Sequence, residues 1–245
     1  MICKGCSTER EKLSKSHIIP RFFFEELREN RSIKLRQYTN SKGKFNKNLP
    51  IGVYDQTILC DICENRFQTP DNYAKELLVL NRDLITAFKQ YPEKDIKLKV
   101  PITDLKFFFM TVLWRASVSS MEFFKSVKLD NAIESYLHDL IWQEATGQDF
   151  EFPFLLERLL PSTHADVIHK VVLDPRPVMI DEMLFYKFVF GGYVIRVKSC
   201  LKKISPTSKL YERLTSTQII IGNGGNFDDT KLATVIRKVL KETGD

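Results

Sequence analysis

The chain has 245 residues and a net charge of +6, and its hydrophobic content of 43% is ordinary for a globular protein with a buried core. Its longest apolar stretch, residues 105–118, contains Lys106 and Arg115 and is too short to span a bilayer. No apolar run with a cleavage site follows Met1, and thiols spaced as metal ligands suit a reducing compartment, so a cytoplasmic location is predicted.

The first 80 residues predict a small mixed module. A helix is expected directly after Pro20, over residues 21–29, and a second helix from Cys63 to about Leu80. Between them, strands are predicted over residues 32–38 and 54–59, on either side of a polar loop at residues 40–48.

Beyond residue 80 the pattern changes from helical to extended. Helices are predicted over residues 101–125, 130–146 and, more briefly, 154–160. Strands are predicted over residues 167–173, 183–190, 193–199 and 217–221, with Gly191 and Gly192 as a hairpin turn, and a closing helix over residues 227–242. The expected fold class is α+β, with a zinc module at residues 1–80 followed by a helical region and an antiparallel sheet at residues 81–245.

Four of the five cysteines form two matched pairs, and these give the strongest motif in the chain. Each pair has C-x-x-C spacing, which can place both sulfurs on one ion, and two pairs complete a tetrahedral shell of four thiolates. We therefore expect one structural zinc ion bound by Cys3, Cys6, Cys60 and Cys63.

Positive charge is concentrated near the N-terminus. Residues 1–50 hold twelve Lys and Arg against five Glu, a net charge of +7, so the remainder of the chain is close to neutral. A basic excess beside a zinc site is typical of a surface that contacts phosphate, although a solvated surface rich in lysine gives the same pattern. The predicted nucleic-acid contacts are Arg21, Lys42, Lys44, Lys47 and Arg66.

The segment Leu13-Ser14-Lys15-Ser16-His17-Ile18-Ile19-Pro20, followed by Cys60-Asp61-Ile62-Cys63-Glu64-Asn65-Arg66-Phe67, resembles the HNH endonuclease superfamily. The resemblance implies a ββα-metal, treble-clef-like fold in which His17 on the first strand is the general base. It also implies that Glu64, directly after the second cysteine pair, ligates a catalytic magnesium or manganese ion.

The resemblance is limited mainly to the first 80 residues, and two positions depart from the family pattern. Ser16 stands where the family normally has an acidic residue or a histidine that ligates the metal, and Glu64 replaces an amide. The next carboxylate along the predicted helix is Asp71. With Leu113-Trp114-Arg115-Ala116-Ser117 included, the chain is also similar to uncharacterised bacterial zinc proteins of HNH-like type.

Two hypotheses about function follow. The first is a metal-dependent endonuclease that hydrolyses phosphodiester bonds in DNA or RNA, in a setting such as phage defence. The second is a catalytically inactive zinc module that binds nucleic acid, or a protein partner through residues 81–245. Trp114 and Arg115 are expected to anchor the core, with the guanidinium reaching a carboxylate or a partner surface, and no role is predicted for His138.

Overall fold

The computed structural model describes residues 1–24, 36–38, 47–48, 54–160 and 171–226. Its helices are α1 (Asp61–Asn65), α2 (Gln68–Lys75), α3 (Arg82–Gln90), α4 (Thr103–Val118), α5 (Asn131–Trp142) and α7 (Tyr211–Leu214). A π-helical turn, Glu76–Leu80, extends α2, and two 3-10 turns span Arg21–Phe24 and Glu122–Phe124. None of the helices in these ranges is long and apolar enough to cross a membrane.

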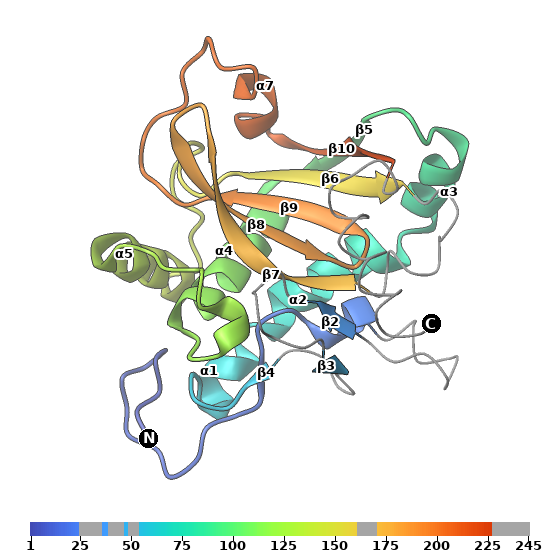
Figure 1. The fold of residues 1–245 in the computed structure, drawn as a ribbon. Coiled ribbons are helices and arrows are strands. Elements are labelled where there is room, and N and C mark those ends of the chain that lie inside the picture. Colours follow the sequence, from blue (N-terminus) through green and yellow to red (C-terminus); the bar gives the residue numbers. More distant parts are fainter. Residues whose placement is uncertain (25–35, 39–46, 49–53, 161–170, 227–245) are drawn as a thin grey trace.

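Strands form one large sheet and one small one. The two-stranded sheet pairs β1 (Ser16–His17) with β4 (Tyr54–Asp55). The large sheet has the order β3-β2-β7-β8-β9-β6-β10-β5 (Figure 1). Its strands are β2 (Arg36–Tyr38), β3 (Lys47–Asn48), β5 (Ile96–Pro101), β6 (Phe154–Leu160), β7 (Val171–Ile180), β8 (Met183–Phe190), β9 (Tyr193–Lys198) and β10 (Gln218–Asn226).

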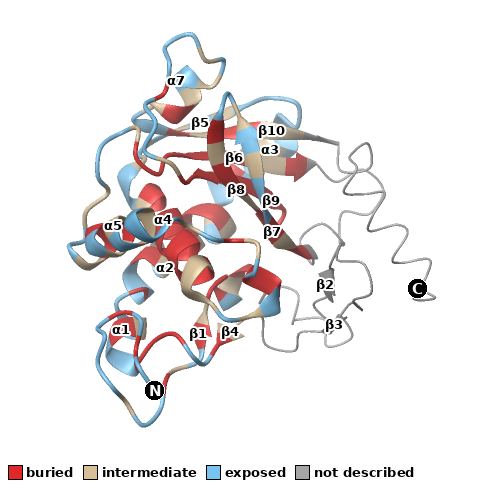
Figure 2. Ribbon diagram, turned by 60° about the vertical axis from the view of Figure 1, so that its left-hand side comes forward, coloured by how far each residue is buried: buried red, intermediate tan, exposed pale blue. Residues whose placement is uncertain are grey.

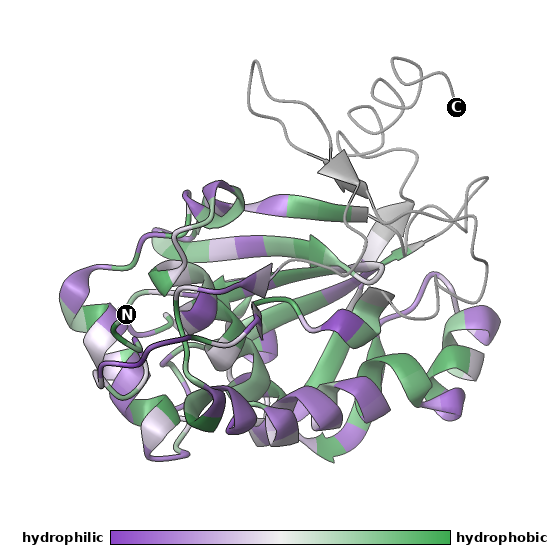
Figure 3. Cartoon of the chain, turned by 90° about the horizontal axis from the view of Figure 1, so that it is seen from below, coloured by the Kyte–Doolittle hydropathy of each residue, from purple (hydrophilic) through white to green (hydrophobic). Residues whose placement is uncertain are grey.

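The large sheet is mainly antiparallel, as expected, but it is mixed. Strand β10 pairs with β6 in parallel, and β2 pairs with β7 in parallel. The β8–β9 hairpin turns at Gly191 and Gly192, whose φ angles of 59° and 80° lie in the region that favours glycine. Figure 3 shows strands that are mostly hydrophobic, with single hydrophilic residues between.

Helix α4 is the centre of the core. Every residue from Phe108 to Ala116 is buried, because the helix lies between the sheet on one side and α2 and α5 on the other (Figure 2). Phe109 packs on Phe154 of β6 with ring centroids 4.7 Å apart. A helix that is hydrophobic all round is buried, and α4 departs from this pattern at two buried cations, Lys106 and Arg115, of which Arg115 has no exposed surface.

Most predicted elements are present, and the mixed α+β class is confirmed. The helix predicted over residues 154–160 is wrong, since these residues form β6, with β9 and β10 on either side. Strand β5 and helix α3 were not predicted. The helix at residues 227–242, residues 167–170 and most of the segment 25–46 lie outside the described residues.

One buried cluster contains residues from both proposed domains, from Cys3 and Ile18 to Phe188 and Ile221. The division near residue 80 stays a prediction.

Candidate metal centre and the neighbouring histidine

The two cysteine pairs meet in space although Cys6 and Cys60 are 54 positions apart in the chain. The sulfurs of Cys3, Cys6, Cys60 and Cys63 all lie within 4.8 Å of one another, and those of Cys6 and Cys60 are 3.9 Å apart. A tetrahedral zinc ion with bonds of about 2.3 Å requires sulfurs about 3.8 Å apart. The backbone N–H of Cys60 also donates to Cys3 Sγ over 3.2 Å. These four cysteines are therefore close enough to hold one metal ion such as zinc.

The loop around the first cysteine pair is held by its own backbone. Cys3 N–H donates to the carbonyl of Thr8, and Ser7 N–H donates back to the carbonyl of Cys3. Hydrogen bonds with Thr8 lower the pKa of Cys6 to about 6, whereas burial raises the pKa of Cys63. A bound cation favours the thiolate form of every ligand.

Helix α5 fixes this loop to the body of the protein. His138 Nε2 lies 2.9 Å from the carbonyl oxygen of Gly5, and its ring stacks on Trp142 with centroids 4.2 Å apart. Gly5 has no room for a side chain, because a Cβ there would lie 2.4 Å from Trp142 Cζ2. His138 thus has a structural role that its position in the sequence did not reveal.

His17 lies on β1, opposite Tyr54 of β4, and the two rings are 5.8 Å apart. Neighbouring residues on a strand face opposite sides, and here Ser16 is fully buried while His17 is partly exposed. Asp55, opposite Ser16, accepts hydrogen bonds from Thr57, Ser119 and Ser120, which tie β4 to the end of α4.

Arg115 joins the strand of His17 to the helices. Its Nη1 donates to the carbonyl oxygen of His17 over 2.7 Å, and its Nη2 lies 3.0 Å from Asp71 Oδ1. The guanidinium also lies 4.8 Å from the ring centroid of Phe67. Burial raises the pKa of Asp71, and the charges of Arg115 and His17 act in the opposite direction. The expectation that Arg115 reaches a carboxylate is confirmed.

Two buried oxygens on β1 and α1 have no hydrogen-bond partner among the residues that the structure describes. They are Ser16 Oγ on β1 and Glu64 Oε2 on α1. An unpaired buried acceptor costs about 1–3 kcal/mol, so each is a place where a ligand or an ion would be favourable.

The predicted nucleic-acid contacts that the structure describes come from separate elements. Arg21 is exposed at the start of a 3-10 turn, Lys47 lies in β3, and Lys42 and Lys44 lie outside the described residues. Arg66 donates to the carbonyl of Trp142 over 2.9 Å and lies 3.4 Å from Glu144.

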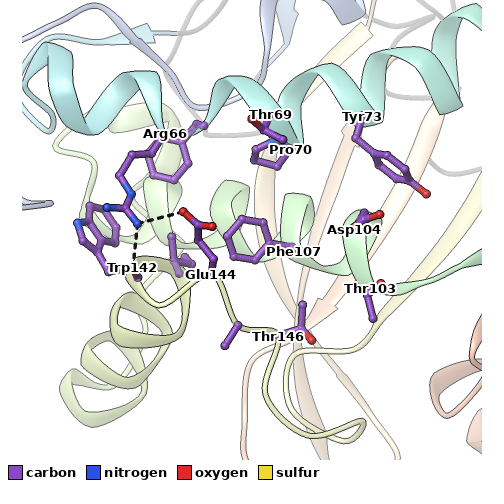
Figure 4. Close-up of a pocket in the computed structure, with 13 residues that line it drawn as sticks. Arg66, Thr69, Pro70, Tyr73, Thr103, Asp104, Phe107, Trp142, Glu144 and Thr146 are labelled. Carbon is purple, nitrogen blue, oxygen red and sulfur yellow. Dashed lines mark hydrogen bonds and ion pairs between the residues drawn. The ribbon is translucent and has the colours of Figure 1, made fainter.

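Arg66 also borders a pocket of about 580 Å³ between α2, α4 and α5. In Figure 4 its guanidinium reaches toward Glu144, and Phe107 and Pro70 form an apolar wall beside them. Burial and the charge of Asp104 raise the pKa of Tyr73, at the other end of this pocket. Sequence reasoning did not find this pocket, because its walls come from three separate helices.

No family model matches the chain, and no curated protein or solved structure is similar enough to match it.

Proposed function

We propose that the chain is a metal-dependent endonuclease of HNH type that hydrolyses phosphodiester bonds in DNA or RNA. In this proposal the cysteine cluster binds a structural zinc ion and closes a treble-clef module. His17 on β1 is the general base, and α1 supplies a carboxylate to a catalytic cation.

One observation carries the proposal. In the HNH pattern the two metal ligands are the residue before the catalytic histidine and the residue after the second cysteine pair. Those positions are Ser16 and Glu64, and they carry the two buried oxygens that lack a hydrogen-bond partner in the described residues. A carboxylate and a hydroxyl are hard oxygen donors, which suit magnesium or manganese better than zinc.

Each residue of the proposed site has a separate role in hydrolysis. A divalent cation held by Glu64 would polarise the scissile phosphate and stabilise the leaving oxygen. His17, partly exposed, accepts the proton of the attacking water. Arg115 holds the carbonyl of His17, so the strand that carries the imidazole keeps its place against α2 and α4.

The direct test is cleavage of single- and double-stranded DNA and RNA with magnesium or manganese. His17→Ala should lower the rate by about 10²–10⁴-fold while zinc content and nucleic-acid binding persist, and Lys15→Ala next to it serves as the control. Glu64→Ala should lose activity that extra metal partly restores. If wild-type protein and Ser16→Asp, which adds the usual ligand, are both inert on all four substrates, the endonuclease proposal is wrong.

A second function is favoured by the burial of Ser16 and by the pairing of Asp71. Ser16 has no exposed surface, and both carboxylate oxygens of Asp71 accept from Arg115, at 3.0 and 3.4 Å. Fewer ligands then remain for a catalytic ion. In this alternative the chain is a catalytically inactive zinc module that binds nucleic acid, or a protein partner through residues 81–245. Binding without cleavage in the experiment above would support it.

A further inference from the structure

Three cations lie side by side across the middle of the large sheet. In the register of the sheet, Arg176 of β7 is opposite Lys187 of β8, and Lys187 is opposite Arg196 of β9. Residues directly opposite one another in a sheet point to the same face. Neighbouring strands are about 4.8 Å apart, so the outer two Cα atoms of this cationic row are about 10 Å apart.

The cationic row (Arg176, Lys187 and Arg196) lies on the face of the sheet turned away from α4. Phe185, two residues before Lys187 and so on the same face, packs under Ile204 and Leu214. Tyr186 and Phe188, on the other face, belong to the core around α4. The side chains of Arg176 and Arg196 are 45% and 23% exposed, and Lys187 is partly exposed, so solvent reaches the row.

The two arginines have partners, whereas the lysine between them has none among the described residues. Arg176 lies 3.0 Å from Asp174, and Arg196 lies 2.6 Å from Glu157. Burial lowers the pKa of Lys187, the charges of Arg196 and Arg176 lower it further, and the charge of Glu157 acts in the opposite direction. Like charges directly opposite one another destabilise a sheet, and the two carboxylates, Asp174 and Glu157, are fewer than the three cations of the row.

A fourth cation borders the row. Arg213 Nη1 lies 3.6 Å from the second oxygen of Glu157, and its guanidinium covers Gly222 so closely that a Cβ there would lie 2.2 Å from Nη2. Its Nε is buried and has no hydrogen-bond partner in the part of the chain that is described. Glu157 therefore orients two arginines while neutralising only one charge.

We propose that the cationic row is a binding site for a phosphate group, centred on Lys187. A phosphate offers several oxygens to one ammonium and two guanidinium groups at once, and charge-assisted bonds of this kind are the strong ones. The phosphate belongs either to a nucleic-acid strand or to a small phosphorylated molecule. The row lies on β7, β8 and β9 of the large sheet, whereas His17 lies on β1 of the small one, and the site does not depend on the proposed hydrolysis.

The test compares Lys187→Gln with wild-type full-length protein. Binding of short labelled DNA and RNA strands is measured by fluorescence anisotropy without added magnesium or manganese, and binding of inorganic phosphate by calorimetry. Lys187→Gln should weaken binding about tenfold and reduce the salt dependence of log K by about one unit, and Lys187→Arg should retain binding. Affinity that grows with strand length identifies a nucleic acid, and binding of phosphate alone identifies a small molecule.

Lys97→Gln is the matched control, because Lys97 is an exposed lysine on β5 paired with Glu212. Equal affinity of the Lys187→Gln and Lys97→Gln proteins, or no binding of either ligand by the wild type, overturns the proposal. So does a lower Tm of Lys187→Gln, since removing one of three adjacent cations from a binding site should leave the Tm unchanged or raise it. Because the readout is binding without a divalent cation and not cleavage, a protein that binds through Lys187 but cleaves nothing separates a failure of the endonuclease proposal from a failure of this one.

Discussion

Arg115, with no exposed surface, donates from Nη1 to the carbonyl oxygen of His17 over 2.7 Å. The same guanidinium is paired with Asp71, whose side chain is 20% exposed. One buried cation thus connects α4, α2 and the short strand that carries the predicted general base. Because the charge of Arg115 is balanced mainly by Asp71, the stability of the protein and the position of His17 depend on the same contact.

Arg115→Met should therefore be among the most destabilising single changes in the chain. It leaves the largely buried Asp71 without its partner, which typically costs about 3–5 kcal/mol in free energy of unfolding. Urea denaturation measures the loss. Arg66→Met is the control, because its partner Glu144 is 78% exposed and such surface pairs contribute about 0–1 kcal/mol. Equal losses in the two variants would show that the Arg115–Asp71 pair has no special role.

Asp55 should make part of the stability depend on pH. Burial acts to raise its pKa, but the hydrogen bonds from Thr57, Ser119 and Ser120 outweigh burial and lower it. A carboxyl group with a lowered folded-state pKa stabilises the protein fully above its unfolded pKa of about 3.9. That contribution is lost as the pH falls through the folded-state pKa.

Asp55→Asn should consequently cost about 1–3 kcal/mol near neutral pH, and the difference from wild type should shrink as the pH falls below about 4. Unfolding by urea at both pH values gives the two differences. Asp139→Asn, at a side chain that is 60% exposed, should show little change at either pH. A difference between wild type and Asp55→Asn that is constant with pH would contradict the assigned hydrogen bonds.

The sequence was most informative where chemistry depends on spacing. The two C-x-x-C pairs predicted that four sulfurs lie close together, since two such pairs are a usual ligand set for one structural zinc ion. The β8–β9 hairpin was also predicted, because Gly191-Gly192 between two apolar runs has few alternatives. The two glycines of the hairpin are adjacent in the chain, and the four cysteines belong to a known set of metal ligands.

Contacts between distant segments could not be predicted. The Asp71–Arg115 pair joins residues 44 positions apart, and the His138–Gly5 contact joins residues 133 positions apart. Phe154–Leu160 was misread as a helix because a short run that is apolar on both sides fits a buried helix or a buried strand equally well. In the structure these residues pair with β9 on one side and with β10 on the other, so they form a strand.

Removal of the metal should unfold the N-terminal segment or lower the Tm of the whole protein. The four sulfurs lie within 4.8 Å of one another, and a bound cation would link the two cysteine pairs, so its free energy of binding would add to the stability of the fold. Elemental analysis should show about one zinc ion per chain, and a chelator should lower the Tm in step with zinc release. A fully folded protein with an unchanged Tm and no metal would contradict the zinc site.

Gly5→Ala should weaken the metal centre without removing a ligand. The added methyl would lie 2.4 Å from Trp142 Cζ2 and 3.0 Å from the sulfur of Cys63. The loop must then move away from α5, at a cost typical of overpacking, about 1–3 kcal/mol, and the carbonyl of Gly5 loses its contact with His138. Faster zinc release to a colorimetric chelator and a lower Tm would report the change.

Lys4→Ala, at the neighbouring exposed position, is the control and should release zinc at the wild-type rate. His138→Ala should resemble Gly5→Ala, because it removes the hydrogen bond to the Gly5 carbonyl and the stacking on Trp142. If Gly5→Ala and Lys4→Ala release zinc equally slowly, the docking of the cysteine loop on α5 does not support the metal centre. If Gly5→Ala and His138→Ala release zinc quickly and Lys4→Ala does not, α5 stabilises the metal centre through Gly5 and His138.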